Sequence, residues 1–387
     1  MNIHFTYNKI KKIMKISTVG FLILIVVVAL VNQSCSSTSY SIGDIKMEKI
    51  EKSAHYKEGE FINYKPSPDW GITDIIPIMW DFIFTGNDRK PDEILPLSQV
   101  DFNQIVNAKT DELKVTWVGH SSLIINIDGK IILTDPIYFN KTVFLGPGRY
   151  NGDVPFDIDE LPEVDLVVIS HNHYDHLNSS TIEKIHSKVK HFIAPLMVGA
   201  ELEEMGVPRE KITELDWWEE INLFDNFLIA LTPTQHFSGR GLFDRDETLW
   251  GSFVIQGPNH KIYFSGDSGY FEGFKEIGDK YGPFDLTFLE CGAYNERWHF
   301  VHMMPEETAQ AHIDLRGKIL HPIHWGTFDV SLHSWYDPMI RISKAADSLG
   351  IMLSTPIIGE TITIDENLVT ERWWEPILSN EKLVVKN

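Results

Sequence analysis

One short segment, residues 171–176 (HNHYDH), constrains this chain more than any other. Three imidazoles and one carboxylate fall within it, directly after residues 165–170 (DLVVIS), which are typical of a strand buried on both faces. Packing does not explain these groups, because burying ionisable side chains without a ligand is strongly unfavourable. Imidazole and carboxylate groups bind zinc and similar divalent cations. The segment therefore predicts a metal site at the end of a buried strand.

Three single residues later in the chain extend this ligand set. His236 (TPTQHFSG), Asp267 (YFSGDSGY) and His324 (HPIHWG) each follow a predicted strand. Loops at strand ends gather functional side chains over a rigid scaffold. Together with the first segment they supply enough ligands for two metal ions. The predicted metal ligands are His171, His173, Asp175, His176, His236, Asp267 and His324.

The pattern of apolar residues predicts a mixed α/β (α+β) domain over residues 113–387. The Asp128-Gly129 pair between two apolar runs is a strong hairpin signal. Strands with helices between them, in two successive halves, favour two sheets packed face to face with helices outside. Strands are expected at 114–118, 123–127, 130–134, 165–170, 227–232, 249–255, 261–265, 285–290 and 318–324, and helices at 179–187, 198–205, 305–316 and 336–349.

The beginning of the chain is typical of a secretory signal. A lysine-rich stretch precedes an apolar run at residues 19–31, and Cys35 follows Ser34. The placement of Cys35 resembles a bacterial lipoprotein signal, with a lipidated cysteine that fixes the protein to a membrane of the bacterial cell envelope. An uncleaved membrane anchor and an ordinary cleaved signal are the alternatives. The expected divisions are a signal at 1–34, a tether at 35–65, an N-terminal extension at 66–112 and the metal-binding α/β domain at 113–387.

The apolar segment at residues 70–84 (WGITDIIPIMWDFIF) has two interpretations. It packs on the core, or it adsorbs to a bilayer as a membrane-facing surface. Pro77 is expected to interrupt any helix there.

Charge and cysteine content exclude two classes of protein. A formal net charge of −21, without a basic cluster, argues against nucleic acid as a partner. The only cysteines, Cys35 and Cys291, exclude a disulfide framework. Cys291 is interpreted as a buried structural residue, because no paired base accompanies it in the motifs.

Several stretches together resemble a known family. They include residues 167–177 (VVISHNHYDHL), 214–220 (ELDWWEE), 264–270 (FSGDSGY), 292–298 (GAYNERW) and 321–328 (HPIHWGTF). The first is typical of the metallo-β-lactamase superfamily, and the set resembles its phospholipases D that hydrolyse N-acylphosphatidylethanolamine. The resemblance covers roughly residues 110–345. It implies a four-layer αββα metallo-β-lactamase sandwich, a homodimer and a membrane phospholipid as substrate.

The resemblance also implies roles for individual residues. One zinc ion falls to His171, His173 and His236, and a second to Asp175, His176 and His324, with Asp267 and a hydroxide between them. His302 would face the substrate phosphate, and Tyr174 would line the same pocket. Asp175 or Asp267 would orient or deprotonate the water. Other divalent metals are alternatives to zinc. His120 either supports the site from behind or is a core histidine, and both interpretations stay open.

The expected activity is metal-dependent hydrolysis of N-acylphosphatidylethanolamine to phosphatidic acid and an N-acylethanolamine. A lactonase, or another small-molecule hydrolase on the same two-metal site, is the first alternative. The second is a non-catalytic envelope lipoprotein that keeps the fold, although none of the seven ligands is missing.

Overall fold

The computed structural model describes residues 49–66, 68, 72–84, 88–142, 146–241, 243–365, 368 and 371–378. The predicted signal, Cys35 and the tether up to residue 48 lie outside the described residues. Those expectations therefore stay predictions.

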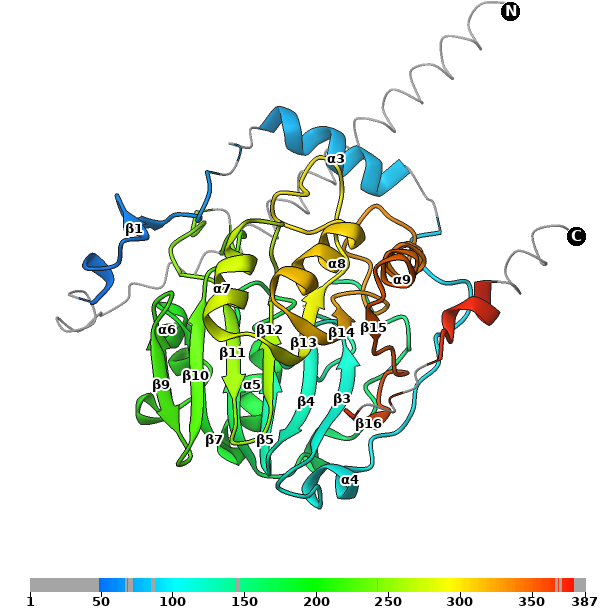
Figure 1. Ribbon diagram of the computed structural model, residues 1–387. Coiled ribbons are helices and arrows are strands. Elements are labelled where there is room, and N and C mark those ends of the chain that lie inside the picture. Colours follow the sequence, from blue (N-terminus) through cyan, green and yellow to red (C-terminus); the bar gives the residue numbers. More distant parts are fainter. Residues whose placement is uncertain are drawn as a thin grey trace, which may run out of the picture.

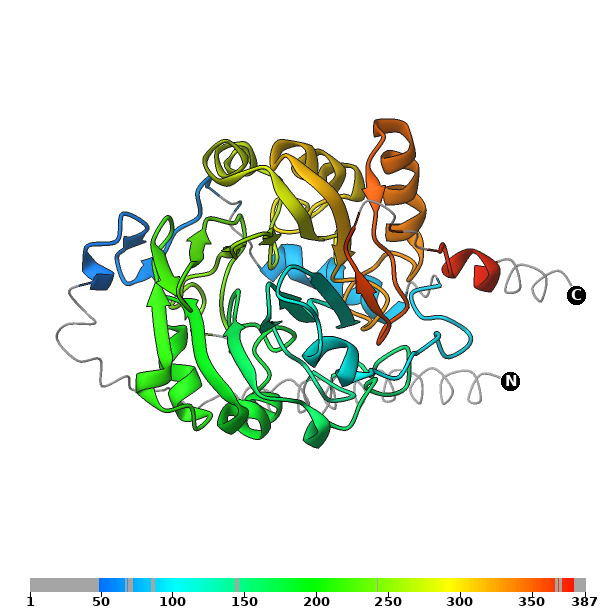
Figure 2. The same cartoon turned by 60° about the horizontal axis from the view of Figure 1, so that its bottom comes forward.

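Two seven-stranded sheets pack face to face. The strand order is β16-β3-β4-β5-β6-β7-β8 in one sheet and β15-β14-β13-β12-β11-β10-β9 in the other. Helices α5 and α6 pack on the outer face of the first sheet, and α7, α8 and α9 cover the second (Figures 1 and 2). The predicted αββα sandwich is confirmed.

The helices and strands have the following bounds. The first sheet contains β3 Leu113–Gly119, β4 Ser122–Ile127, β5 Lys130–Thr134, β6 Val164–Val168, β7 Val189–Pro195, β8 Ile212–Leu215 and β16 Thr361–Thr363. The second contains β9 Glu220–Leu223, β10 Phe227–Thr232, β11 Ser252–Gln256, β12 Lys261–Phe264, β13 Phe284–Glu290, β14 Gly317–Ile323 and β15 Met352–Leu353. A small hairpin pairs β1 Tyr56–Lys57 with β2 Glu60–Phe61. The α-helices with both ends among the described residues are α3 Ile72–Phe84, α4 Phe102–Val106, α5 Ser179–Ile185, α6 Val198–Glu204, α7 Gly273–Tyr281, α8 Pro305–Asp314 and α9 Asp337–Leu349. Short 3-10 helices are η1 Ile158–Glu160, η2 His186–Lys188 and η3 Arg209–Lys211.

Local sequence explains the hairpin at the centre of the first sheet. Ile127 pairs with Lys130 across a two-residue turn, as predicted. Asp128 and Gly129 both have positive φ (51° and 82°), which the favoured two-residue hairpin turn requires. β6 is buried at every position, as expected of a central parallel strand. Large apolar side chains such as Phe253 and Phe264 fill the core.

The prediction that Pro77 interrupts any helix is wrong. Pro77 lies inside α3, five residues after its first residue. The hydrogen bond that proline cannot donate would reach the carbonyl of Thr73, in the first turn, so the helix loses only one terminal bond. α3 crosses over the end of the sandwich where the loops gather (Figure 1). Among the described helices, none is both long and apolar enough to cross a bilayer.

Candidate metal centre

Strand direction explains why the predicted ligands meet. β12, β13 and β14 run parallel to one another, as do β5 to β8. β10 runs in the same direction as β12, because each is antiparallel to β11. Within each sheet the carboxyl ends of these strands therefore lie at one end, and the ligand atoms that follow β6 and β10 lie within 4.8 Å of one another, so the two ends coincide. Residues 171–176 follow β6, whereas His236, Asp267 and His324 follow β10, β12 and β14.

The first ligand group contains His171, His173 and His236. Their ring nitrogens lie within 4.8 Å of one another. His171 Nε2 is 2.9 Å from His173 Nδ1, and His236 Nε2 is 3.3 Å from the same Nδ1. His236 comes from the second sheet and the other two from the first, so the group joins the two halves of the domain. This trio has the geometry of one three-imidazole metal site.

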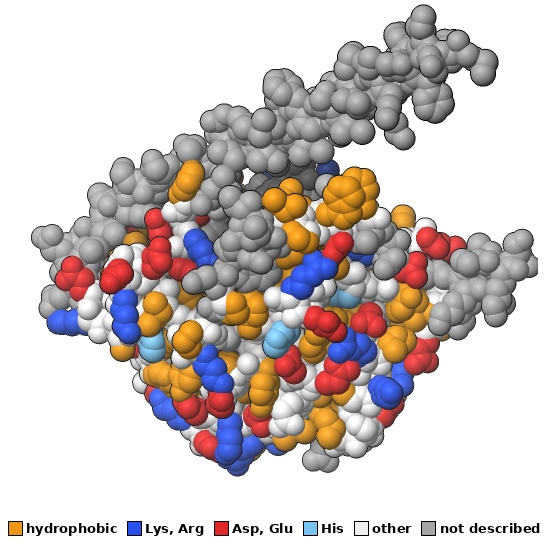
Figure 3. Space-filling model, turned by 90° about the horizontal axis from the view of Figure 1, so that it is seen from above, with side chains coloured by type: hydrophobic (Ala, Val, Ile, Leu, Met, Phe, Trp, Pro, Cys, Tyr) orange, Lys and Arg blue, Asp and Glu red, His pale blue; other side chains and the backbone are white. Residues whose placement is uncertain are grey.

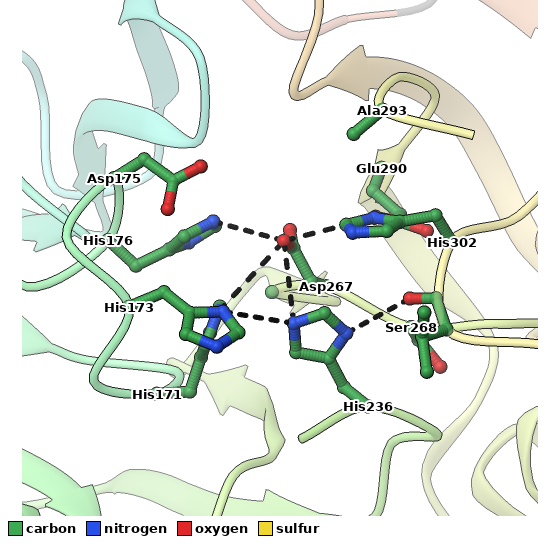
Figure 4. A network of polar contacts seen from close by, with 12 residues as sticks. His171, His173, Asp175, His176, His236, Asp267, Ser268, Glu290, Ala293 and His302 are labelled. Carbon is green, nitrogen blue, oxygen red and sulfur yellow. Dashed lines mark hydrogen bonds and ion pairs between the residues drawn. The ribbon is translucent and has the colours of Figure 1, made fainter. Parts of the chain in front are cut away.

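Asp267 lies between this group and a second one. Its Oδ2 is 3.2 Å from His176 Nε2 and 3.1 Å from His324 Nε2. The same oxygen is 3.8 Å from His236 Nε2, and Figure 4 shows His171, His176 and His236 directed at this carboxylate. One carboxylate thus contacts ligands of both groups, which is the position of a bridging ligand.

Asp175 completes the second group, and His120 lies directly behind it. Asp175 Oδ2 is 3.1 Å from His120 Nε2 and 3.7 Å from His324 Nε2. His120 is 1% exposed and has a positive φ of 54°. A rare backbone conformation at a site is often maintained because it aims a side chain. The structure thus favours the interpretation in which His120 supports the site.

The second ring nitrogen of key histidines is held from outside the site. His176 Nδ1 is 2.7 Å from Asp135 Oδ2, and His236 Nδ1 is 3.0 Å from the carbonyl oxygen of Val301. Each partner accepts a hydrogen bond from Nδ1–H, which leaves the Nε2 lone pair directed at the centre. Histidines that bind metals are oriented in this way.

Unpaired atoms at the centre fit a bound cation. His176 Nε2, His324 Nε2 and Asp267 Oδ1 are buried and make no hydrogen bond of acceptable geometry within the described part of the chain. Leaving buried polar atoms unpaired is unfavourable, so each such atom needs an explanation. Convergent imidazole and carboxylate donors suit divalent metal ions.

The surroundings of the ligands shift most of their pKa values towards the deprotonated forms that bind metal, with His176 as the exception. Burial lowers the pKa of His173 to about 4. Burial would raise the pKa of Asp267, but His176 and His324 outweigh it and hold that pKa well below its usual range. Against its own burial, Asp267 and other acceptors raise the pKa of His176 well above the usual value. A metal must displace that proton, so we expect metal affinity to fall as pH falls.

Arg240, which the sequence analysis did not single out, secures both ends of the loop that carries the ligands. Its Nη1 donates to the carbonyl oxygens of Asn172 (2.7 Å) and Leu177 (2.8 Å). Its guanidinium lies 4.1 Å from the ring centre of Tyr174 and pairs with Glu201 at 3.5 Å. Tyr174, a predicted substrate contact, thus packs on Arg240. It is not among the described residues that line a cavity between α3 and His302, next to the ligands.

Two carboxylate residues beside the site, Asp135 and Glu290, were also not singled out from the sequence. Asp135 follows β5 directly and is fully buried against His176. Glu290 ends β13 and is fully buried, with Oε2 at 2.8 Å from Nδ1 of His302. His302 Nδ1 is 3.9 Å from Asp267 Oδ2, so this predicted catalytic residue does lie beside the ligands. A carboxylate at the end of an apolar run was the available signal in both cases.

Comparison with known proteins agrees with this geometry. The family model described as the Beta-lactamase superfamily domain matches residues 130–325. An uncharacterised protein of Mycobacterium tuberculosis is 37% identical over 333 residues, which cover 84% of this chain and 88% of the relative. N-acyl-phosphatidylethanolamine-hydrolyzing phospholipase D 1 of Caenorhabditis elegans is 33% identical over 312 residues, covering 74% and 86%.

A solved structure supports the fold. A metallo hydrolase from the archaeon Ignicoccus hospitalis has a TM-score of 0.50 at 24% identity, covering 66% of this chain and 99% of that protein. The family match, the two curated relatives and the clustered ligands agree on one assignment. The chain therefore belongs to the metallo-β-lactamase superfamily, as a metal-dependent hydrolase that resembles the N-acylphosphatidylethanolamine-hydrolysing phospholipases D.

Proposed function

We propose that this chain is a zinc-dependent phosphodiesterase of the phospholipase D type. It would hydrolyse N-acylphosphatidylethanolamine between phosphate and ethanolamine, and release phosphatidic acid and an N-acylethanolamine. The similarity to the Caenorhabditis elegans enzyme supports this substrate class. The structural observation that carries the proposal is an apolar cavity that meets the candidate metal centre at His302.

This cavity has a volume of about 290 Å³ and lies between α3 and the site. Apolar side chains dominate its lining, among them Ile78 and Phe82 of α3, Phe237 and Trp298. His302 contributes a polar group beside Asp267. A ligand with an apolar chain and a phosphate matches this combination, because the chain enters the cavity while the phosphate stays at the ligands.

The chain's own residues support phosphodiester hydrolysis. The seven ligands would hold two divalent cations, which would lower the pKa of a shared water molecule and offset charge on the phosphoryl group. Asp175 or Asp267 would orient that water or accept its proton. His302, on the cavity side, would donate to a phosphoryl oxygen. Apolar walls around the site would exclude bulk water and strengthen these electrostatic interactions.

The test uses the purified full-length chain. Metal content is measured first, followed by turnover of N-acylphosphatidylethanolamine and of a simple lactone, each with and without a chelator. We expect about two zinc ions per chain and release of N-acylethanolamine that stops on chelation. Lactone turnover without lipid turnover would be consistent with a metal-dependent hydrolase but would contradict the proposed lipid substrate.

We further propose that the enzyme works at a membrane of the bacterial cell envelope. Lipidated Cys35 and α3 would both contribute, and the homodimer implied by the resemblance stays a prediction. α3 exposes Ile76 (59%), Trp80 (61%) and Phe84 (62%), which lie four residues apart and therefore share one face. Ile78 and Phe82 point the other way, into the cavity. Figure 3 looks onto this end of the molecule and shows hydrophobic side chains grouped there.

Replacing Trp80 and Phe84 by serine is expected to weaken action on vesicles. Withdrawing an aromatic side chain from an apolar environment costs about 1.5–3 kcal/mol, so the apparent KM for vesicle substrate should rise about tenfold or more. Turnover of a water-soluble short-chain analogue should not change. A Cys35→Ser background prevents the lipid anchor from masking the effect.

Leu349→Ser, which removes an exposed apolar side chain from α9, is the matched control. The negative charge of the chain gives anionic lipid no electrostatic advantage. The effect should therefore depend little on salt. An unchanged KM on vesicles would reject the membrane role of α3.

A further inference from the structure

The Glu290 carboxylate holds two consecutive residues of a loop. Its Oε2 is 2.8 Å from Nδ1 of His302, and its Oε1 accepts a hydrogen bond from the backbone N–H of Met303 at 2.6 Å. Both oxygens are therefore in use, and the side chain is fully buried. One carboxylate thus fixes the ring of one residue and the backbone of the next.

Glu290 is itself rigidly placed. It is the last residue of β13, and its backbone N–H donates to Ser265 Oγ at 3.0 Å. Its carbonyl oxygen accepts from Thr308 Oγ1, at the start of α8, at 2.8 Å. His302, by contrast, belongs to the irregular segment 291–304 between β13 and α8. The position of the His302 ring thus depends on contact with a strand end.

The chemistry of this contact points to a task beyond packing. A carboxyl group is costly to bury unless its oxygens are paired, and a glutamine has only one acceptor oxygen, so it could accept from Nδ1–H of His302 or from the backbone N–H of Met303 but not from both. A carboxylate draws the Nδ1 hydrogen of a neighbouring imidazole towards itself and thereby fixes the ring. With Nδ1 committed to Glu290, Nε2 is the nitrogen that His302 can offer to a ligand in the cavity.

We propose that Glu290 is a positioning residue that holds the His302 imidazole with Nε2 facing the reacting group in the cavity. This inference rests on the proposed function, because that function identifies the reacting group as a phosphodiester. One competing role exists, because ligand atoms of Glu290, Asp267, His302 and His324 lie within 4.8 Å of one another. Glu290 could then bind a metal directly, and the experiment separates these roles.

The test is a double-mutant cycle in the full-length enzyme with Glu290→Ala, His302→Ala and the combined variant. If Glu290 acts only through His302, the single variants lose about 10- to 100-fold in kcat. The combined variant should be within about threefold of His302→Ala alone, since effects on one shared function do not multiply. Both metals should remain in every variant, as measured by elemental analysis.

The isosteric variant Glu290→Gln guards against a folding defect. We expect it to keep the fold and both metals, and to lower kcat about tenfold with little change in KM. If Glu290 were needed only for packing, glutamine, which has nearly the same shape, would leave kcat unchanged. Glu214→Gln is the matched control, because Glu214 is also buried and accepts from the backbone N–H of Gly199, but belongs to β8.

Three results would overturn the inference. They are multiplicative losses in the combined variant, wild-type kcat in Glu290→Gln, and loss of a metal in the Glu290 variants but not in His302→Ala. The cycle is measured on N-acylphosphatidylethanolamine and on bis(4-nitrophenyl) phosphate. If the wild type cleaves only the second, the proposed lipid substrate fails while the cycle still decides the role of Glu290. If it cleaves neither, both proposals fail.

Discussion

Replacing Asp267 by asparagine is expected to remove most of the bound metal and to lower turnover of any substrate at least a thousandfold. Asp267 Oδ2 lies within 3.2 Å of Nε2 of both His176 and His324, and the side chain is only 3% exposed. An amide keeps the shape but loses the negative charge that would join two cations. Metal ions contribute several kcal/mol to transition-state stabilisation, and each 1.36 kcal/mol is a factor of ten in rate.

Metal content by elemental analysis and turnover at saturating substrate check this expectation. Asp225→Asn is the control, because it makes the same chemical change at an exposed position outside the site. Circular dichroism would show that Asp267→Asn is folded. A variant that kept two metals and wild-type turnover would show that Asp267 does not bridge the two groups.

The metal ligands could be predicted because the chain itself marks them. Residues 171–176 are adjacent in sequence, and His236, Asp267 and His324 each follow an apolar run. Once those runs are strands of two parallel-rich sheets, their carboxyl ends meet. Sequence reasoning needed only the strands, without their order, to place these ligands at one end of the domain.

Other parts of the fold carried a weaker signal. β9 alternates exposed and half-buried residues at an edge of its sheet, so no apolar run marks it. β7 contains Lys190 and His191, which interrupt its apolar pattern. α3 contains a proline, whose effect depends on its position within the helix, and the sequence does not show where that helix begins.

The supporting residues depend on contacts between distant segments. Asp135 meets His176 because β5 pairs with β6. Arg240 reaches the loop after β6 from the loop after β10, on the other sheet. Glu290 supports a residue twelve positions later through a loop of irregular shape. Local patterns do not specify such pairings, because they follow from strand order and loop path.

Replacing Asp135 is expected to have the second large effect. Two different substitutions should separate its contribution to stability from its contribution to metal affinity. Its Oδ2 accepts from His176 Nδ1 at 2.7 Å, and its Oδ1 accepts from the backbone N–H of Ser170 at 2.7 Å. Asp135→Ala would leave both donors buried and unpaired, and would place alanine at a φ of 35°. We expect its free energy of unfolding to fall by about 3–5 kcal/mol, measured by urea denaturation in the presence of chelator.

Asp135→Asn separates orientation of His176 from packing. An asparagine amide can donate to Nδ1 of His176, which would move the ring hydrogen to Nε2, the atom that faces the metal centre. Metal affinity should then fall about 10- to 100-fold, while stability in chelator falls less than in Asp135→Ala. Stabilisation by added zinc should shrink by about 1.4–2.7 kcal/mol, since each tenfold loss of affinity removes about 1.4 kcal/mol.

Asp128 supplies a matched control for this experiment. It is buried and accepts from Nδ1 of His260 at 2.6 Å, but it lies in the β4–β5 turn, at the opposite end of the strands from the ligands. Asp128→Asn should lower stability with and without zinc by the same amount. If Asp135→Asn behaved likewise, the Asp135–His176 contact would serve the fold alone. A loss confined to the zinc-dependent part would assign Asp135 to orienting a metal ligand.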